Sequence, residues 1–166
     1  MQIAITGHTS GIGKALYDNL KVDNEVIGFA RTTDRDINYP SRILKECKDC
    51  DIFINNAYDG WAQIDLLYAL VYNKFKGKII SIGSISGDNI KHNIFPYAIH
   101  KGTLDDANAQ LYHMGMKVTC IRPGYIDTPR VNHRTDIRKL DVKYVVEAVN
   151  WVISRPHRVK DITLSV

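Results

Sequence analysis

Short apolar runs alternate with longer amphipathic stretches along the whole chain. The runs are continuous and are bounded by residues such as Gly, Asn and Pro, which is typical of parallel strands buried on both faces. The predicted strands are Gln2–Thr6, Glu25–Arg31, Asp51–Asn55, Lys78–Ser84, Lys117–Arg122 and Ile162–Val166. Between them, apolar residues recur every three or four positions, as in amphipathic helices. The predicted helices follow the turn at 7–13 and then cover Ser41–Lys48, Trp61–Phe75, Tyr97–Met114 and Asp141–Ile153.

This alternation of strands and helices predicts the fold class. It indicates a parallel sheet with helices on both faces. We expect an α/β protein, with a single doubly wound Rossmann-type domain over residues 1–166 and a mostly parallel sheet of about six to seven strands. One more short strand is expected at Asp36-Ile37, the third in chain order. These two residues follow the second strand so closely that no helix fits between the second and third strands.

Composition places the chain among ordinary globular domains. It has 166 residues, 45% hydrophobic and 24% charged, which suits one compact core. The net charge of +4 permits an anionic ligand but is too small for a nucleic-acid partner, which needs clustered basic residues. Met1 leads directly into an apolar strand, with neither a basic leader nor a long apolar span. We therefore expect a cytoplasmic protein with no membrane partner.

Three cysteines also fit a reducing compartment, and two of them form a CxxC motif. Cys47 and Cys50 follow a predicted helix and precede a strand, whereas a redox CxxC normally sits at a helix N-terminus, where the dipole stabilises a thiolate. No second pair completes a zinc site. We expect a structural role for both and no metal.

The first functional motif is a glycine-rich turn between a strand and a helix. Glycines permit a tight turn and close approach of the backbone to a pyrophosphate, and the following helix N-terminus supplies N–H groups. The alternative is a plain glycine turn, but the strand before it and the amphipathic helix after it favour phosphate binding. The residues predicted to form this cradle are Gly7, Thr9, Ser10, Gly11, Ile12 and Gly13.

The second predicted strand ends in Arg31, where the adenosine ribose of a dinucleotide lies. An acidic residue there would accept a hydrogen bond from a free 2′-hydroxyl, whereas arginine suits a 2′-phosphate. No Asp or Glu occupies this end, so the sequence predicts NADP(H) over NAD(H), with Thr32 sharing the phosphate.

The candidate catalytic group comprises Ser84, Tyr97 and Lys101. Tyr97 and Lys101 stand four residues apart on a predicted helix, so they share one face. A nearby ammonium lowers the pKa of a phenol, because opposite charge favours the ionised form, and such a phenol can exchange a proton near neutral pH. Ser84 ends the preceding strand, where ligands of open α/β sheets bind.

The same Tyr-xxx-Lys spacing occurs twice more, at Tyr17/Lys21 and Tyr72/Lys76. Neither pair follows a serine at a strand end, and the spacing alone describes an ordinary solvated helix pair. We expect both to lie on the surface.

Five motifs occur in the order and topological places of the short-chain dehydrogenase/reductase family, and the chain resembles an unusually short member of it. The motifs are Thr6-Gly7-xxx-Gly11-Ile12-Gly13, Asn55-Asn56-Ala57, Ser84, Tyr97-xxx-Lys101 and Pro123-Gly124-xxx-Thr128. The resemblance implies NAD(P)-dependent oxidation of a small alcohol or reduction of a small carbonyl compound. In that scheme Tyr97 exchanges the proton, Ser84 binds the substrate oxygen, and Lys101 binds the nicotinamide ribose and supports ionisation of the phenol.

The resemblance also implies further cofactor contacts. Asp36 and Ile37 match the family's adenine contact, and the turn that follows the predicted strand Asp51–Asn55 faces the cofactor next. The residues implied there and at the nicotinamide are Asn55, Asn56, Ala57, Pro123, Gly124, Ile126 and Thr128. Family members often pair through the tyrosine helix and the helix before it, which implies a homodimer or homotetramer.

Two departures from the family pattern stand out. Tyr58 follows Asn55-Asn56-Ala57 where the family usually has glycine, and no asparagine occupies the family's position in the helix before the serine strand. Either Gln63, the nearest amide, or a solvent-fed proton path takes the place of that asparagine.

The segment Arg130–Lys139 is expected to read the substrate. It carries four basic residues and His133. Two interpretations stay open: a solvated loop that touches the phosphates of the cofactor, or a lid that selects a substrate with a carboxylate or a phosphate.

Two functions remain. The leading hypothesis is an NADP(H)-dependent oxidoreductase acting on a small carbonyl or alcohol substrate. The alternative is an NADP-binding regulatory protein with little or no catalytic activity, since a fold alone does not prove a function. The presence of Ser84, Tyr97 and Lys101 together favours the enzyme.

Overall fold

The computed structural model describes residues 1–89 and 92–166. The chain divides into two compact units, Met1–Ile80 and Ser81–Val166. Its six strands are hydrogen-bonded in the order β2-β1-β3-β4-β5-β6, and the pairings described within each unit are parallel. The predicted α/β class and the number of strands are confirmed, while one independent domain over the whole chain stays a prediction.

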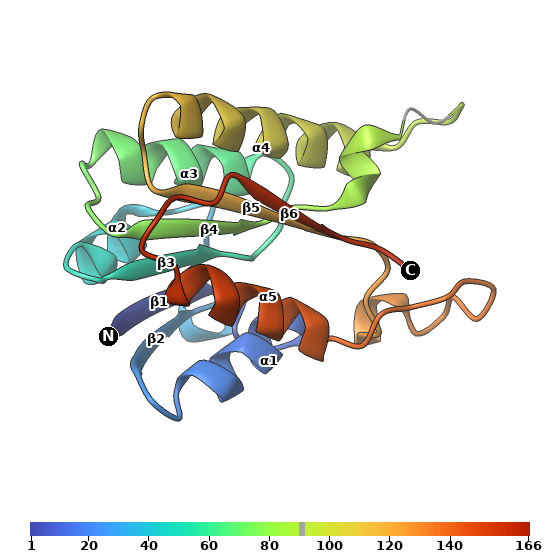
Figure 1. Ribbon diagram of the computed structural model, residues 1–166, viewed down its shortest axis with the longest axis horizontal. Helices are drawn as coiled ribbons and strands as arrows, with labels where there is room; N and C mark the ends of the chain where they lie inside the picture. The colour runs from blue at the N-terminus through green and yellow to red at the C-terminus, as the bar shows by residue number, and fades with distance from the viewer. Residues whose placement is uncertain (90–91) are drawn as a thin grey trace. The chain divides into compact units, whose positions relative to one another are not determined.

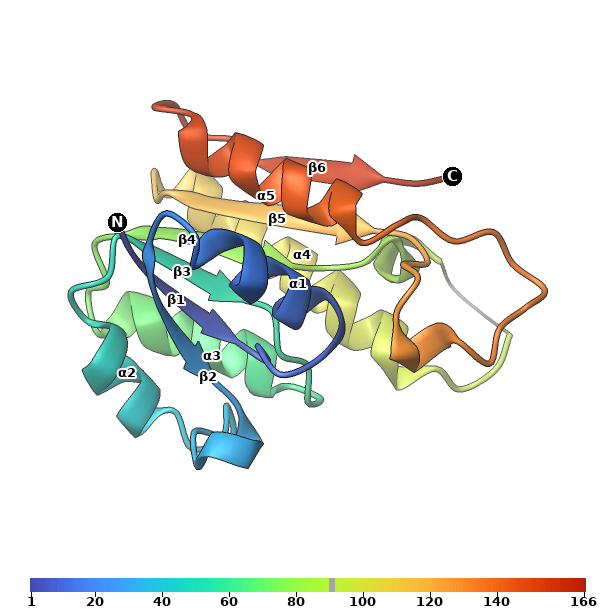
Figure 2. The ribbon, with the colours of Figure 1, turned by 90° about the horizontal axis from the view of Figure 1, so that it is seen from below.

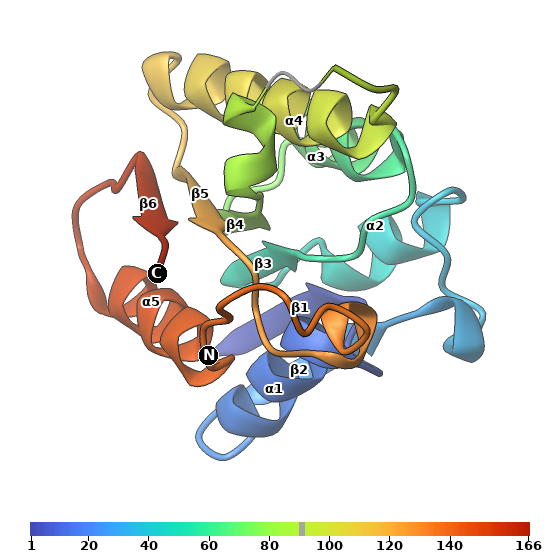
Figure 3. The same ribbon diagram turned by 90° about the vertical axis from the view of Figure 1, so that its right-hand side faces the viewer.

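The first unit is built around β1. Its elements are β1 Gln2–Thr6, α1 Gly11–Leu20, β2 Glu25–Phe29, α2 Ser41–Cys47, β3 Ile52–Asn55, α3 Ala62–Tyr72 and the start of β4 Lys78–Ile82. β1 pairs with β2 on one side and with β3 on the other. In this unit α1 lies on one face of the strands, and α2 and α3 lie on the opposite face (Figure 1, Figure 3).

Both faces of β1 are therefore covered, which explains its unbroken apolar sequence. Ile3 and Ile5 are fully buried, and so are Leu16 of α1 and Leu67 of α3. Burial of each such side chain contributes about 1.5–3 kcal/mol. This packing fixes the carboxyl ends of β1 and β3, where the glycine-rich turn and the Asn55-Asn56-Ala57 turn begin.

The expected third strand at Asp36-Ile37 is wrong. After β2 the chain forms a short 3-10 helix, Arg31–Thr33, and then turns, with Asp34 at a φ of +56°. The carboxylate of Asp36 accepts a hydrogen bond from the backbone N–H of Asn38 at 2.9 Å, which closes a local turn and competes with strand geometry. The other part of the prediction is confirmed, because no α-helix separates β2 from this turn.

The second unit is built around β5 and β6, which pair in parallel. Its elements are the end of β4, the 3-10 helix η2 Ile85–Asp88, α4 Pro96–His113, β5 Val118–Pro123, the 3-10 helix η3 Pro129–Val131, α5 Lys143–Ser154 and β6 Asp161–Leu164. In this unit α4 and α5 cover opposite faces of β5 and β6 (Figure 1, Figure 2). Leu104 and Leu111 of α4 and Val145 and Val149 of α5 are buried in its core.

The turn between β1 and α1 requires glycine for two reasons. Gly7 and Gly11 have φ values of +73° and +52°, in the left-handed region that glycine enters without steric cost. Gly13 is closely packed, since a Cβ at this position would lie 2.1 Å from the Gly7 carbonyl oxygen and 2.5 Å from Nδ2 of Asn56. The backbone of this turn therefore packs directly on the turn that follows β3.

We expect Gly13→Ala to lower the free energy of unfolding by about 2 kcal/mol, because the added methyl group meets backbone that cannot move aside. Urea denaturation measures the change. Lys14→Ala, at the exposed next position of α1, is the matched control and should change stability by less than about 0.5 kcal/mol. Equal stability of Gly13→Ala and Lys14→Ala would contradict the close packing.

Candidate active site

The first group of predicted site residues lies on two turns of the first unit. Oγ1 of Thr6, at the end of β1, accepts hydrogen bonds from the backbone N–H groups of Asn56 at 3.0 Å and Ala57 at 2.9 Å. The Asn56 amide donates back to the Thr6 carbonyl oxygen at 2.9 Å. These bonds join the two turns, so the glycine-rich turn and the Asn55–Ala57 turn hold a fixed geometry.

The N-terminus of α1 suits an anion. The first turn of this helix contains no acidic residue, and Ser10 is its N-cap residue but makes no side-chain capping bond. Thr9 and Ser10 are both exposed. Orphan N–H groups, the helix dipole and two exposed hydroxyls are the donor set that a pyrophosphate needs.

The edge of the unit that was expected to hold the adenosine ribose carries more charge than the sequence suggested. Arg31 is 73% exposed in its side chain, and its Nη1 lies 3.5 Å from Oδ2 of Asp59. The same carboxylate accepts a hydrogen bond from the Asn38 amide at 2.9 Å. A hydrogen bond from the backbone of Asn38 lowers the pKa of Asp36, so this carboxyl is ionised at neutral pH. Asp59 was not among the predicted residues, because it follows Tyr58 in the departure from the family pattern.

The amides of Asn55 and Gln63 join β3 to α3. Nε2 of Gln63 donates to the Asn55 carbonyl oxygen at 2.7 Å, and Nδ2 of Asn55 donates to the Gln63 carbonyl oxygen at 2.8 Å. Both residues are buried. The structure thus gives the Gln63 amide a role in holding the start of α3.

The second group of predicted residues lies in the second unit, on α4 and the segment before it. Pro96 occupies the first turn of α4, where its fixed φ and missing N–H suit a helix start. Tyr97 follows at once and is half-buried, and Lys101 comes one turn later and is 3% exposed. Nζ of Lys101 lies 5.7 Å from the centroid of the Tyr97 ring and donates to the Ile82 carbonyl oxygen at 2.8 Å. The ammonium and the phenol therefore lie on the same side of the helix.

Ser84 is 6% exposed and is the N-cap residue of η2. Its Oγ accepts a hydrogen bond from the Ser86 backbone N–H at 3.1 Å, which leaves the hydroxyl proton to be donated elsewhere. A close glycine contact holds η2 against α4: a Cβ at Gly87 would lie 2.7 Å from the backbone nitrogen of Gly102. The serine turn is thus held against the helical turn that carries Lys101.

Burial lowers the pKa of Lys101 to about 8. Removal of an ammonium from water disfavours its charged form, and the positive charge of Arg130 lowers the pKa further. Cys120 and the carboxylate of Asp105 act in the opposite direction. Near neutral pH the site therefore keeps a buried cation beside the phenol.

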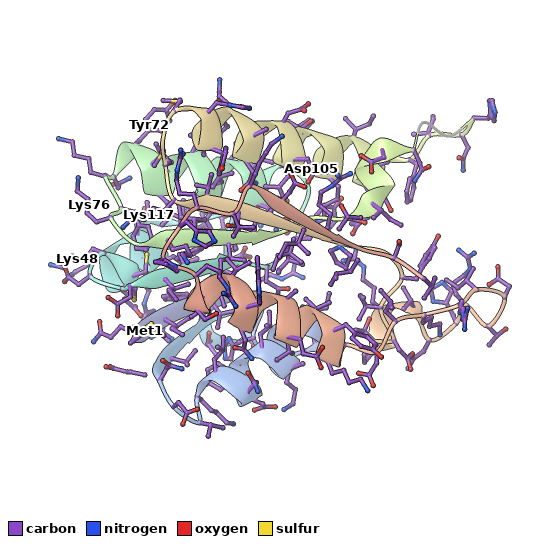
Figure 4. The ribbon with its side chains drawn as sticks, in the orientation of Figure 1. Met1, Lys48, Tyr72, Lys76, Asp105 and Lys117 are labelled. Carbon is purple, nitrogen blue, oxygen red and sulfur yellow. The ribbon has the colours of Figure 1, made fainter. Side chains whose placement is uncertain are left out.

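Asp105 is the residue of this group that the sequence analysis missed. It lies one helical turn beyond Lys101, so the spacing of Tyr97, Lys101 and Asp105 was a readable signal. Its Oδ2 lies 2.9 Å from Nε of Arg122, and its Oδ1 accepts a hydrogen bond from the Cys120 thiol at 3.1 Å. Figure 4 labels Asp105 on α4, and both of these partners belong to β5. Burial raises the pKa of this carboxyl, and Cys120 and Arg122 oppose the rise.

Arg122 also forms an ion pair with Asp88 of η2. One guanidinium on β5 therefore contacts a carboxylate on α4 and another on the segment after Ser84. Both Arg122 and Asp105 are 18% exposed in their side chains, so solvent screens these pairs only in part. We call Asp88, Arg122 and Asp105 the charged bridge.

The turn after β5 leads into a closed loop. The backbone N–H of Gly124 donates to the Leu164 carbonyl oxygen at 2.8 Å, and Ile126 is buried. Leu140 closes the base of the loop by two backbone bonds of 2.8 Å, one donated to Tyr125 and one accepted from Asp127. Pro123 is buried at the end of β5, and Oγ1 of Thr128 donates to the Ile126 carbonyl oxygen at 3.3 Å.

Three basic residues of this loop contact different groups. The Arg134 guanidinium binds both carboxylate oxygens of Asp136, at 2.8 and 2.9 Å. Nζ of Lys139 lies 3.7 Å from the Asp127 carboxylate. Arg130 is exposed, and its Cζ lies 5.3 Å from the centroid of the Tyr97 ring. The structure thus brings Arg130 to the predicted catalytic tyrosine.

Of the other two Tyr-xxx-Lys pairs, Tyr72 and Lys76 lie on the surface, as expected, whereas Tyr17 is half-buried, with its ring centroid 5.0 Å from that of His8. Tyr72 is 80% exposed and Lys76 is also exposed, and Figure 4 labels both near the end of α3. Lys21 forms an ion pair with Asp18, at 2.6 Å.

The cysteines are reduced and buried. Burial raises the pKa of Cys47 to about 12 and also raises the pKa of Cys50, so neither thiol is a nucleophile at neutral pH. Among residues 1–89 and 92–166, no group of three or more His, Cys, Asp or Glu side chains is arranged to bind a metal. Over the same residues, no helix has the length and apolar character needed to cross a membrane.

Solved structures of nicotinamide-dependent enzymes share this architecture. A short-chain dehydrogenase from Burkholderia cenocepacia in complex with NADP superimposes with a TM-score of 0.80 at 18% sequence identity, over 99% of this chain and 88% of that one. The closed form of a serine dehydrogenase with NADP+ gives 0.80 at 20% identity, over 99% and 94%. The chain has the short-chain dehydrogenase/reductase fold. The resemblance seen in the sequence is confirmed for the fold.

Relatives by sequence match only part of the chain. No family model matches the chain. An uncharacterized oxidoreductase of Staphylococcus saprophyticus is 31% identical over 103 residues, which cover 58% of this chain and 44% of that protein. One from Staphylococcus epidermidis is 33% identical over 105 residues, with the same coverage. The match thus spans less than half the length of these relatives.

We expect Lys101 to titrate near pH 8 in the cofactor-free protein, while exposed lysines titrate near 10.4. Asp105→Asn should lower the pKa of Lys101, because this carboxylate stabilises the ammonium. NMR of lysine ¹³Cε signals measures both, with Lys101→Met to assign the resonance. Asp106→Asn, at the exposed neighbouring position, is the control and should leave the titration unchanged. A Lys101 titration that is the same in Asp105→Asn would contradict this electrostatic role.

Proposed function

We propose that the protein is an NADP(H)-dependent oxidoreductase that transfers hydride between the nicotinamide and a small carbonyl or alcohol substrate. The observation that carries this proposal is the buried ammonium of Lys101 beside the Tyr97 ring, next to the turn that holds Ser84. The oxidoreductase names of the partial relatives and the nicotinamide complexes of proteins with the same fold support it.

The chemistry assigned to these residues follows from charge development on the substrate. The cofactor, when bound, supplies the hydride for reduction of the carbonyl carbon. As the carbonyl oxygen becomes negative, the hydroxyls of Ser84 and Tyr97 stabilise it as donors, and Tyr97 gives its proton to form the alcohol. The positive charge of Lys101 stabilises the phenolate that this transfer leaves. In the oxidation direction Tyr97 takes the proton back.

The cofactor contacts follow the same proposal. The uncapped N-terminus of α1 and the hydroxyls of Thr9 and Ser10 fit a pyrophosphate, and the close packing of Gly13 against Gly7 holds this turn in place. The remaining contacts are assigned by the resemblance to Asp36, Ile37, Asn55, Asn56, Ala57, Pro123, Gly124, Ile126 and Thr128.

Preference for NADP(H) is assigned to Arg31 with Thr32. The exposed guanidinium can bind a 2′-phosphate, and its contact with Asp59 at 3.5 Å is long and solvated, so it is weak enough to be exchanged. Asp59 also offers a carboxylate at the same edge, which moderates this preference.

A second candidate is an NADP-binding regulatory protein without turnover. The use of the Gln63 amide on the Asn55 backbone favours it weakly, because that amide was one of two substitutes for the missing asparagine. Burial of Lys101 argues against it. A desolvated ammonium is costly, and a binding module has no need for it beside a phenol.

We further propose a cytoplasmic homodimer or homotetramer. The three reduced cysteines fit a reducing compartment. Large apolar side chains are exposed on the two helices expected at the interface, with Ile99 of α4 at 62% and Tyr72 of α3 at 80%. These side chains support the proposal because burial of apolar surface drives most protein association.

We expect Tyr97→Phe to reduce kcat at least about 10³-fold, because the variant loses its proton donor, a group whose contribution to catalysis is typically 10²–10⁴-fold. Oxidation of NADPH against a panel of small carbonyl compounds measures the loss. The dissociation constant for NADPH should change less than about threefold, since the aromatic ring stays in place. Tyr68→Phe, a tyrosine of α3 outside the predicted site, is the matched control. Full turnover by Tyr97→Phe would refute the assigned proton transfer.

We expect the protein to bind NADPH more tightly than NADH, and Arg31→Ala to weaken NADPH binding roughly tenfold or more, since a hydrogen bond to a charged group contributes about 1.5–3 kcal/mol. Binding of NADH should be nearly unchanged in the variant. Quenching of protein fluorescence by each coenzyme gives both constants, and Arg42→Ala, another exposed arginine of the first unit, is the control. Tighter binding of NADH by the unmodified protein would reverse the coenzyme assignment.

A further inference from the structure

We propose that Arg130 is the residue that selects the substrate, and that the substrate is an acid whose reacting carbonyl or hydroxyl carbon is bonded to a carboxylate. This substrate class comprises 2-oxo acids and the corresponding 2-hydroxy acids. The inference rests on the proposed oxidoreductase function and deepens it.

Arg130 lies beside the predicted catalytic tyrosine. Its guanidinium carbon lies 5.3 Å from the centroid of the Tyr97 ring. The substrate carbonyl oxygen meets the hydroxyl of this ring in the proposed reaction. A cation beside the ring is therefore near the substituents of the reacting carbon, and a carboxylate bonded to that carbon is within its range.

The backbone that carries Arg130 is held in place by hydrogen bonds. It belongs to η3, whose turn is closed by the hydrogen bond from the Val131 N–H to the Thr128 carbonyl oxygen at 3.0 Å. The loop that carries η3 is closed at its base by the two backbone bonds of Leu140. Pre-organisation of this kind reduces the entropy lost when a ligand binds.

Arg130 differs from three other cations of the second unit, Lys101, Arg122 and Arg134. Lys101 is 3% exposed and donates to the Ile82 carbonyl oxygen. Arg122 is engaged in the charged bridge, and Arg134 binds Asp136 through two hydrogen bonds. Arg130 combines exposure to solvent with contact to the Tyr97 ring.

Two positive charges lie beside the Tyr97 ring, and a bound carboxylate would offset one of them. Arg130 and Lys101 are like charges on the same phenol, and each disfavours the other. A carboxylate bound by Arg130 neutralises one of them and so relieves this repulsion. The planar guanidinium also matches a carboxylate through two parallel hydrogen bonds, which fixes the orientation of the acid relative to the Tyr97 hydroxyl. A neutral carbonyl compound offers neither effect.

The test uses matched substrate pairs, each a 2-oxo acid and its methyl ester, with pyruvate and 2-oxobutyrate as the acids. Reduction is followed by NADPH oxidation in the unmodified protein and in Arg130→Gln, Arg130→Lys and Arg134→Gln. We expect kcat/KM to favour the acid by at least tenfold in the unmodified protein. Arg130→Gln should lose roughly a hundredfold on the acids and little on the esters, with an unchanged dissociation constant for NADPH. Arg130→Lys should recover part of the loss, and Arg134→Gln should behave like the unmodified protein.

Three results would overturn the proposal. Equal losses on acid and ester, with weaker NADPH binding, would assign Arg130 to the cofactor instead. A preference for the ester in the unmodified protein would exclude selection of a carboxylate. If neither member of a pair is reduced, the substrate class is wrong, and Tyr97-dependent reduction of other neutral carbonyl compounds then shows whether the proposed function itself survives.

Discussion

The candidate site in the second unit depends on one ammonium group, that of Lys101, which is buried away from solvent. Lys101 is almost completely buried, and transfer of an isolated cation into a protein interior costs several kcal/mol after relaxation. Its hydrogen bond to the Ile82 carbonyl oxygen ties α4 to the end of β4. The carboxylate of Asp105, one helical turn away, supplies opposite charge. An apolar side chain would fill a purely structural role at a lower cost in free energy, so the retained charge supports the proton transfer proposed for the adjacent Tyr97.

The surroundings of Lys101 depend on contacts that do not touch it. The charged bridge joins Asp88 in η2, Arg122 in β5 and Asp105 in α4, while the approach of Gly87 to Gly102 fixes the distance between η2 and α4. The same elements carry Ser84 and Tyr97. Removal of one member of a partly buried ion pair leaves its partner uncompensated, which destabilises far more than loss of an exposed pair. The arrangement of η2, β5 and α4 around Lys101 thus depends on these ion pairs and on the two glycines, Gly87 and Gly102, which have no side chain.

Elements with a long periodic pattern could be predicted from the sequence, and those set by local hydrogen bonds could not. α1 and α5 have a clear helical period and β1 is a continuous apolar run, so their places were found. The short strand expected at Asp36-Ile37 is not formed because the Asp36 carboxylate closes a turn with Asn38, and hydrophobic patterning does not report that bond. Asp105 could have been found from its spacing to Lys101. Contact between Arg130 and Tyr97 depends on the path of a loop, and no pattern in the sequence specifies that path.

The two cations beside Tyr97 differ in exposure, which suits them to different roles in the proposed reaction. A buried charge is little screened by solvent, so its strength changes little from one substrate to another, and Lys101 suits control of the proposed proton transfer. An exposed charge is screened until a ligand displaces water from it, so its effect depends on what binds. Arg130 therefore suits discrimination between substrates. Exchange of these two roles would fail on both counts, since an exposed lysine would be screened and a buried arginine could not meet a substrate.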